Sequence, residues 1–119
     1  MKWLVLILSF SLNCLELNAQ NDYYERQARS HQNDAAYYVK QVQGYDRDAE
    51  YYMREAASHL RDAEYYHRQK QFEQAKSSLR KARNAIERAD DNKRKADNAR
   101  SNAKAYMRRA EDALQDAKK

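Results

Sequence analysis

The chain has 119 residues, with 23 Lys and Arg, 18 Asp and Glu, one Gly, no Pro and one Cys. Its length holds at most one small domain, and the near absence of Gly and Pro excludes folds that need many tight turns. The formal net charge of +5 is modest for a chain in which 34% of residues are charged, and such mixed charge is typical of a solvated helix surface. An all-α protein built from long helices is therefore predicted.

Residues 1–19 have the layout of a secretory signal peptide. A positive start, Met1-Lys2, is followed by a mainly apolar stretch over 3–12 and a cleavage site after Ala19. The apolar run is shorter than the roughly 20 residues that a transmembrane helix needs, so no transmembrane span is expected. We therefore expect a secreted, extracellular protein, with the bacterial periplasm or envelope as the alternative location.

Cys14 lies inside this N-terminal segment. If cleavage follows Ala19, the mature chain has no cysteine, and neither disulfides nor cysteine–metal sites can form. A lipoprotein modified at Cys14 is the alternative, but the preceding Ser11-Leu12-Asn13 is a poor match to the bacterial lipidation signal.

The remaining chain, residues 20–119, is predicted to be one helical coiled-coil region because it repeats every 14 residues. Four tyrosine pairs follow this spacing: Tyr23-Tyr24, Tyr37-Tyr38, Tyr51-Tyr52 and Tyr65-Tyr66. Fourteen residues are two heptads, and a sustained heptad pattern keeps one seam of a helix facing a partner helix. Helix-pair solenoids are excluded because their repeats are 33 residues or longer.

Two columns at heptad spacing form the predicted seam of the first half. An alanine column comprises Ala28, Ala35, Val42, Ala49, Ala56 and Ala63. A tyrosine column comprises Tyr24, His31, Tyr38, Tyr45, Tyr52, His59 and Tyr66. Small and large side chains therefore alternate along the seam, and Tyr37, Tyr51 and Tyr65 are expected to stay exposed beside it.

The second half has a narrower seam made mainly of methyl groups. One position is always alanine: Ala75, Ala82, Ala89, Ala96, Ala103, Ala110 and Ala117. The position three residues on holds Ser78, Ala85, Asn92, Ala99, Tyr106 and Ala113, and the next column holds Leu79, Ile86, Lys93, Arg100, Met107 and Leu114. Such a face lets another helix approach closely.

The two heptad registers do not connect, because Ala63 and Ala75 are 12 residues apart. We therefore predict a break near residues 70–72, between arms at 21–69 and 73–118. An antiparallel helical hairpin would set the tyrosines of the first arm against the alanines of the second. The alternatives are one continuous helix that dimerises along its length, and a three-helix bundle with breaks near Gly44 and near Asp90-Asp91-Asn92.

The sequence around the break partly resembles a known repeat. Phe72, Ala75, Leu79 and Ala82, after Tyr66, resemble the turn and second helix of a tetratricopeptide unit over about twenty residues. Lys70 stands where that family has glycine, and the family's proline and 34-residue period are absent. The resemblance supports a turn near Lys70-Gln71 and implies no function.

Catalytic and metal-binding patterns are absent from the sequence. His31 and His59 occupy the tyrosine column about 42 Å apart along a straight helix, so they cannot share a metal there. No nucleophile is set beside a base, and the sequence has neither a glycine-rich phosphate loop nor an acidic metal cluster. We therefore expect no enzymatic activity, no catalytic residues, no metal site and no cofactor.

The tyrosines are the best functional lead. Tyr packs a large ring while its hydroxyl stays in water, and it can stack with neighbouring cations. We expect these residues to carry packing and interaction: Tyr24, Tyr38, Tyr45, Tyr52, Tyr66, Ala75, Ala82, Ala89, Ala96 and Ala103. The sequence thus predicts a secreted structural or matrix protein that assembles through coiled-coil contacts, in an extracellular matrix, shell, cement or fibre.

Self-association is the expected partnership, with an acidic matrix protein or polysaccharide as a further partner. The basic segment near Lys93-Arg94-Lys95 is interrupted by acidic residues, and secretion removes the usual nucleic-acid ligand, so nucleic-acid binding is not expected. The alternative function is a secreted helical binding module that recognises a protein or an anionic glycan.

Overall fold

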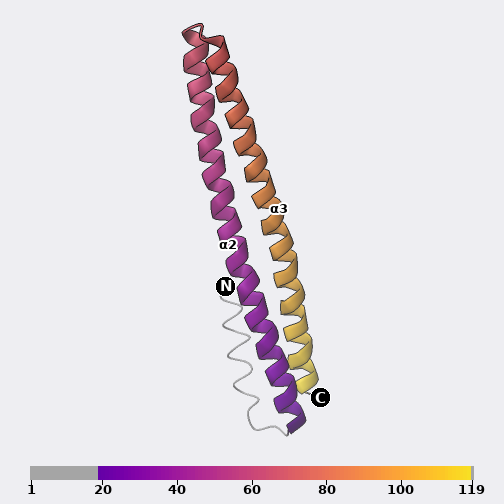
Figure 1. Cartoon of the computed structure of the whole chain (residues 1–119). Coiled ribbons are helices and arrows are strands. Elements are labelled where there is room, and N and C mark those ends of the chain that lie inside the picture. The colour runs from indigo at the N-terminus through magenta and orange to yellow at the C-terminus, as the bar shows by residue number, and fades with distance from the viewer. Residues whose placement is uncertain (1–18, 119) are drawn as a thin grey trace. The chain divides into compact units, whose positions relative to one another are not determined.

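The computed structural model describes residues 19–118 and contains two long helices, α2 (Ala19–Arg68) and α3 (Phe72–Ala117) (Figure 1). Residues 69–71 join them. The predicted all-α fold, with its break near residues 70–72, is confirmed. Cys14 and all but the last residue of the predicted signal peptide lie outside the described residues.

Both helices run without interruption through the positions where a third helix would have required breaks. Gly44 lies inside α2, and Asp90-Asp91-Asn92 lies inside α3. An added Cβ at Gly44 would meet nothing within 4 Å, so no close contact requires glycine there. The three-helix alternative is therefore wrong, and the turn after Arg68 likewise rules out one continuous helix.

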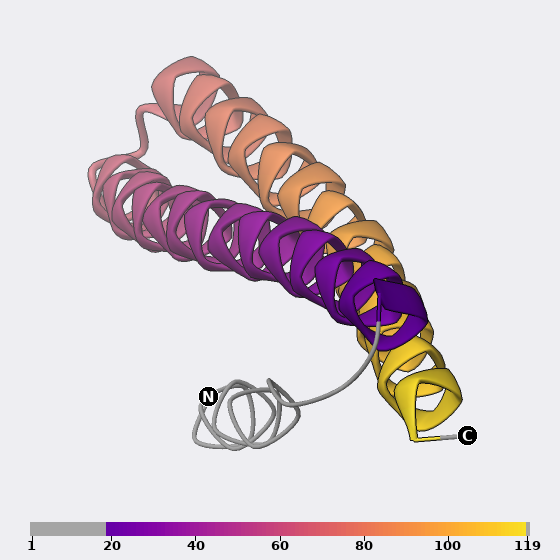
Figure 2. The ribbon, with the colours of Figure 1, turned by 90° about the horizontal axis from the view of Figure 1, so that it is seen from below.

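The turn is a Schellman motif centred on Lys70, seen as the short thin link in Figure 2. The N–H of Lys70 donates to the carbonyl of His67 at 3.0 Å, and the N–H of Gln71 donates to the carbonyl of Tyr66 at 2.8 Å. This pair of bonds satisfies carbonyls left over at a helix end. Lys70 has a φ of 58°, in the left-handed region that glycine normally occupies.

The chain divides into two compact units. The turn unit comprises residues 41–98, and the terminal unit comprises residues 1–40 and 99–119, of which 19–40 and 99–118 are described. In the turn unit Tyr45 meets Lys95 and Tyr52 meets Arg88, so the two helix segments are antiparallel. Its core is alanine: Ala49, Ala56, Ala63, Ala75, Ala82, Ala85, Ala89 and Ala96.

The terminal unit pairs the start of α2 with the end of α3. Ala28 packs in a buried cluster with Ala113 and Leu114. The ring of Tyr38 lies parallel to that of Tyr106, with the centroids 5.6 Å apart and an interplanar angle of 13°. Residues later in α2 therefore meet residues earlier in α3, and this unit is antiparallel as well.

Neither α2 nor α3 is apolar enough along its length to cross a membrane.

Candidate interaction surfaces

The predicted packing residues lie along the seam between the helix segments of each unit. In the turn unit the tyrosines at 45, 52 and 66 are half-buried, and the predicted alanines are fully buried: Ala75, Ala82, Ala89 and Ala96. In the terminal unit Tyr24 and Tyr38 are half-buried, and Ala103 is buried. The small side chains of the predicted seam are therefore buried alanine methyl groups, and the large ones are half-buried tyrosine rings.

Two cations of α3 lie over rings of the tyrosine column. The guanidinium carbon of Arg88 is 5.7 Å from the centroid of Tyr52, and the Nζ of Lys95 is 5.9 Å from the centroid of Tyr45. Cation–π contacts at such distances contribute about 0.5–1 kcal/mol at exposed sites. These two cations are one heptad apart, and Lys81 continues the same column.

An acidic column follows the corresponding edge of α2, at Asp48, Glu55 and Asp62. In an antiparallel pair the two edges on one side of the seam meet, and opposite charges there favour one register. Glu55 lines the same groove as Lys81 and Arg88, so the two edges do meet. The preference for this register is present in the sequence as an acidic column in α2 and a basic column in α3. The net charge of the chain does not reveal it, because that number sums over both columns.

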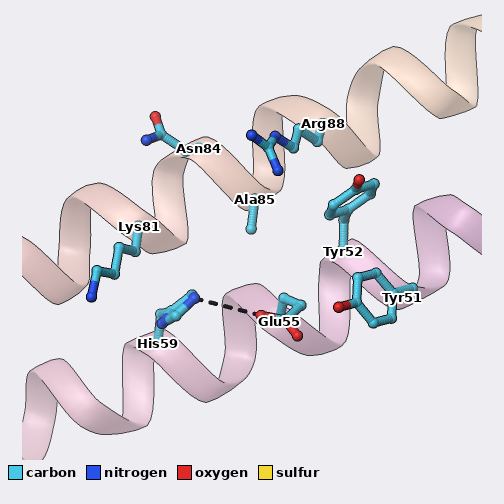
Figure 3. A pocket seen from close by; sticks show the side chains of 8 residues that line it. All are labelled: Tyr51, Tyr52, Glu55, His59, Lys81, Asn84, Ala85 and Arg88. Carbon is cyan, nitrogen blue, oxygen red and sulfur yellow. Dashed lines mark ion pairs between the residues drawn. The ribbon is translucent and has the colours of Figure 1, made fainter.

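That groove lies between α2 and α3 in the turn unit (Figure 3). Its volume is about 270 Å³. It is lined by Tyr51, Tyr52, Glu55 and His59 of α2 and by Lys81, Asn84, Ala85 and Arg88 of α3. Figure 3 shows the ring of Tyr52 standing toward α3 below Arg88.

One ion pair lies along the α2 side of the groove (Figure 3). The Nε2 of His59 lies 3.6 Å from the Oε2 of Glu55, one helical turn away. The same carboxylate accepts a hydrogen bond from the hydroxyl of Tyr51, and this bond, followed by the charge of Glu55, raises the pKa of Tyr51 above its ordinary value of 10.0. The groove therefore holds polar and charged groups suited to contact with a polar partner.

Each adjacent tyrosine pair of α2 forms an edge-to-face dyad. The ring centroids are 5.2–5.5 Å apart and the interplanar angles lie between 67° and 78°. The inner ring belongs to the half-buried tyrosine column, whereas the outer ring projects from the seam. The outer tyrosines are about half exposed: Tyr23 54%, Tyr37 58%, Tyr51 51% and Tyr65 54%. Their exposure agrees with the sequence-based expectation for Tyr37, Tyr51 and Tyr65.

An arginine column runs along the exposed face of α2 in the turn unit. Arg47, Arg54, Arg61 and Arg68 are all exposed and follow one another at heptad spacing. Tyr51 lies within one helical turn of two of these arginines, and Tyr65 within one turn of the other two. Arg54 and Arg68 already follow the 14-residue repeat of the sequence, together with Arg26 and Lys40. Arg47 and Arg61 fill the heptads between and before them, and a search for basic residues clustered along the chain does not reveal the full column.

Several buried polar atoms of the terminal unit have no hydrogen-bond partner. Glu25 is 3% exposed and Gln32 is 5% exposed, and neither the Oε1 of Glu25 nor either amide atom of Gln32 is paired. The Nδ1 of His31 is also buried and unpaired. An unpaired buried polar group costs about 1–3 kcal/mol, so these positions lower the stability of this unit.

Over residues 19–118, no group of three or more His, Cys, Asp or Glu side chains is placed to hold a metal ion. Comparisons with protein-family models, with curated proteins and with solved structures found no match to this chain.

Proposed function

We propose that this chain is a secreted, non-enzymatic structural protein that assembles through the outer tyrosines of its dyads. One observation carries the proposal: four tyrosines on a 14-residue spacing are each about half exposed, although the core beneath them is alanine. About half of the surface of each ring is left open to a partner. A repeated, exposed aromatic group is suited to contacts with other chains.

The physical chemistry of the dyads supports an assembly role. Tyr buries a large ring while its hydroxyl can stay wet, and for this reason it is enriched at protein interfaces. The edge-to-face contact with the inner ring holds each outer ring in place, so little side-chain freedom is lost when a partner covers it. Equal spacing offers a partner the same contact several times.

The extracellular location in this proposal depends on the N-terminal residues, whose layout is that of a signal peptide. A matrix, shell, cement or fibre is the setting that a repetitive, tyrosine-bearing secreted chain fits best. Self-association is the proposed partnership, and an acidic matrix protein or polysaccharide is the proposed additional partner.

Light scattering on the purified protein tests the proposal. We expect assemblies larger than a dimer that grow with concentration. Replacing the four outer tyrosines by glutamine should abolish them, whereas replacing the same four by phenylalanine should retain them because the rings persist. A monodisperse monomer at high concentration would contradict the assembly role.

The arginine column favours a second function, the binding of an anionic glycan. Guanidinium groups at heptad spacing match a chain of sulfate or carboxylate groups, and the adjacent Tyr51 and Tyr65 offer flat surfaces to sugar rings. Retention on a sulfated polysaccharide resin tests this function. Arg54→Gln with Arg61→Gln should lower the salt concentration at elution more than Arg80→Gln with Arg83→Gln, which removes the same charge from α3. Equal effects would indicate unspecific charge attraction only.

A further inference from the structure

A stripe of large apolar side chains lies exposed in the turn unit. Its five members are Met53 at 43% exposure, Leu60 at 46%, Phe72 at 59%, Leu79 at 49% and Ile86 at 38%. Those on each helix are seven residues apart, so each set follows one edge of its helix. We call this surface the apolar stripe.

The two edges of the apolar stripe lie side by side across the seam. The rings of His67 and Phe72 are 5.8 Å apart, which places these two edges together beside the turn. Because the helices are antiparallel and each step is one heptad, the next rows bring Leu60 level with Leu79 and Met53 level with Ile86. The charged groove occupies the opposite side of the seam. The stripe is therefore a continuous apolar band two helices wide.

The margins of the apolar stripe carry opposite charges near the turn. On α2 the outer margin holds Glu50 and Glu64, and on α3 it holds Lys76 and Arg83, followed by Asp90 at the level of Glu50. All five side chains are exposed. Glu64 and Lys76 are each four residues from the helix end at the turn, so they lie at the same level on opposite margins.

We propose that a second copy of this chain packs its apolar stripe against the first, about a two-fold axis parallel to the helices. This inference rests on the self-association proposed above and specifies its first contact. In this orientation α2 of one copy faces α3 of the other, and each Glu64 meets the Lys76 of the second copy. The other face-to-face orientation sets α2 on α2 and places Glu64 against a second acidic margin, and such repulsion disfavours it.

The second copy also buries the apolar side chains of the stripe. At the same level along the two-fold axis, Leu60 of one copy packs against Leu79 of the other, and Met53 packs against Ile86. A four-helix arrangement of this kind buries side chains that a two-helix hairpin leaves half in water. Contiguous exposed apolar surface of this kind marks interaction sites in water-soluble domains.

Sedimentation velocity on the full chain tests the surface. Leu60→Glu with Leu79→Glu should raise the dimer dissociation constant at least about 100-fold, because four leucine side chains are lost from the interface of each dimer. Both residues are exposed and glutamate is a good helix former, so circular dichroism should show unchanged helix content. Ser58→Glu with Ser77→Glu adds the same charges on exposed faces away from the stripe and should leave the dissociation constant within about twofold.

Charge reversal tests the orientation. Glu64→Lys alone and Lys76→Glu alone should each weaken the dimer about 5- to 10-fold, and the double reversal should restore it. Tighter association of Glu64→Lys alone would show that α2 packs on α2 and would overturn the proposed axis. A dimer that survives Leu60→Glu with Leu79→Glu would overturn the stripe itself, as would a wild-type chain that stays monomeric.

The same measurement separates this inference from the proposed function. With the four outer tyrosines replaced by glutamine, we expect the stripe dimer to persist and larger assemblies to disappear. If the wild-type chain forms the dimer but nothing larger, the structural function fails and the dimer stands. If large assemblies persist unchanged in the stripe variant, the dimer fails and the tyrosine-based function stands.

Discussion

The backbone N–H of Gln71 donates a 2.8 Å hydrogen bond to the carbonyl of Tyr66. Together with the bond from the N–H of Lys70 to the carbonyl of His67, it closes the end of α2 and turns the chain toward α3, which begins at Phe72. It forms only because Lys70, between the two residues, adopts a positive φ of 58°. A left-handed conformation strains a residue with a Cβ. A residue without a Cβ at position 70 would therefore remove this strain.

Replacing Lys70 by glycine should therefore raise the free energy of unfolding by about 1 kcal/mol, measured by urea denaturation. Lys70 is exposed, so little packing is lost. Gln69→Gly is the matched control, because Lys70 alone among the described non-glycine residues has a positive φ. Equal stabilisation by both glycines would contradict the strain at Lys70.

Gly44→Ala should also stabilise the protein, by about 1 kcal/mol, because glycine inside a helix costs conformational entropy. The space for the new methyl is free, since nothing lies within 4 Å of it. Thermal unfolding followed by circular dichroism measures the effect. The reverse change at an exposed α2 position, Ala57→Gly, should lower stability by a similar amount; a loss of stability in Gly44→Ala would show an unrecognised contact at this position.

Enlarging a buried alanine should lower the stability of the protein. Ala89 is 0% exposed in the seam of the turn unit, and Ala89→Leu should lower the free energy of unfolding by about 1–3 kcal/mol by forcing the helix segments apart. Ala57→Leu, the same substitution at an exposed position, should change it by less than about 0.5 kcal/mol. If Ala89→Leu is tolerated equally well, the seam is not closely packed.

Removing an unpaired buried amide should strengthen the terminal unit. Gln32 is 5% exposed and neither of its amide atoms has a partner. Gln32→Met keeps an unbranched chain and should raise the free energy of unfolding by about 1–3 kcal/mol. Gln43→Met makes the same change on an exposed face and serves as the control in parallel denaturant titrations. A loss of stability at position 32 would indicate that the amide is satisfied after all.

The hydroxyl of Tyr51 should titrate at higher pH than an isolated tyrosine, because Glu55 accepts its hydrogen bond and adds negative charge. A pKa raised in the folded state favours folding below the ordinary value of 10.0, and that contribution disappears as the pH rises through the folded pKa. In Glu55→Gln the pKa of Tyr51 should move back toward 10.0. Ring NMR signals, assigned with Tyr51→Phe, measure the shift, and Glu50→Gln should leave it in place.

Several features of the candidate surfaces could be read from spacing alone. The exposed position of Tyr37, Tyr51 and Tyr65 follows from their offset by one residue from the tyrosine column. The arginine column and the opposed charged columns were equally present in the sequence, but they appear only when residues seven apart are compared. The contact of Arg88 with Tyr52 required the register between the helices, which no single helix contains.

The sequence by itself determined two long helices, the break between them, and which residues share a helix edge, because heptad spacing and the lack of turn residues act locally. The tertiary structure alone decided which members of an edge are covered. Leu79 and Leu114 belong to one predicted column, yet Leu79 is 49% exposed and Leu114 is 7% exposed. Leu114 packs with Ala28 from the start of α2, whereas Leu79 belongs to the uncovered apolar stripe. A periodic sequence places the same kinds of residue at every repeat. Whether a given residue is buried depends on which residues of the other helix lie at its level.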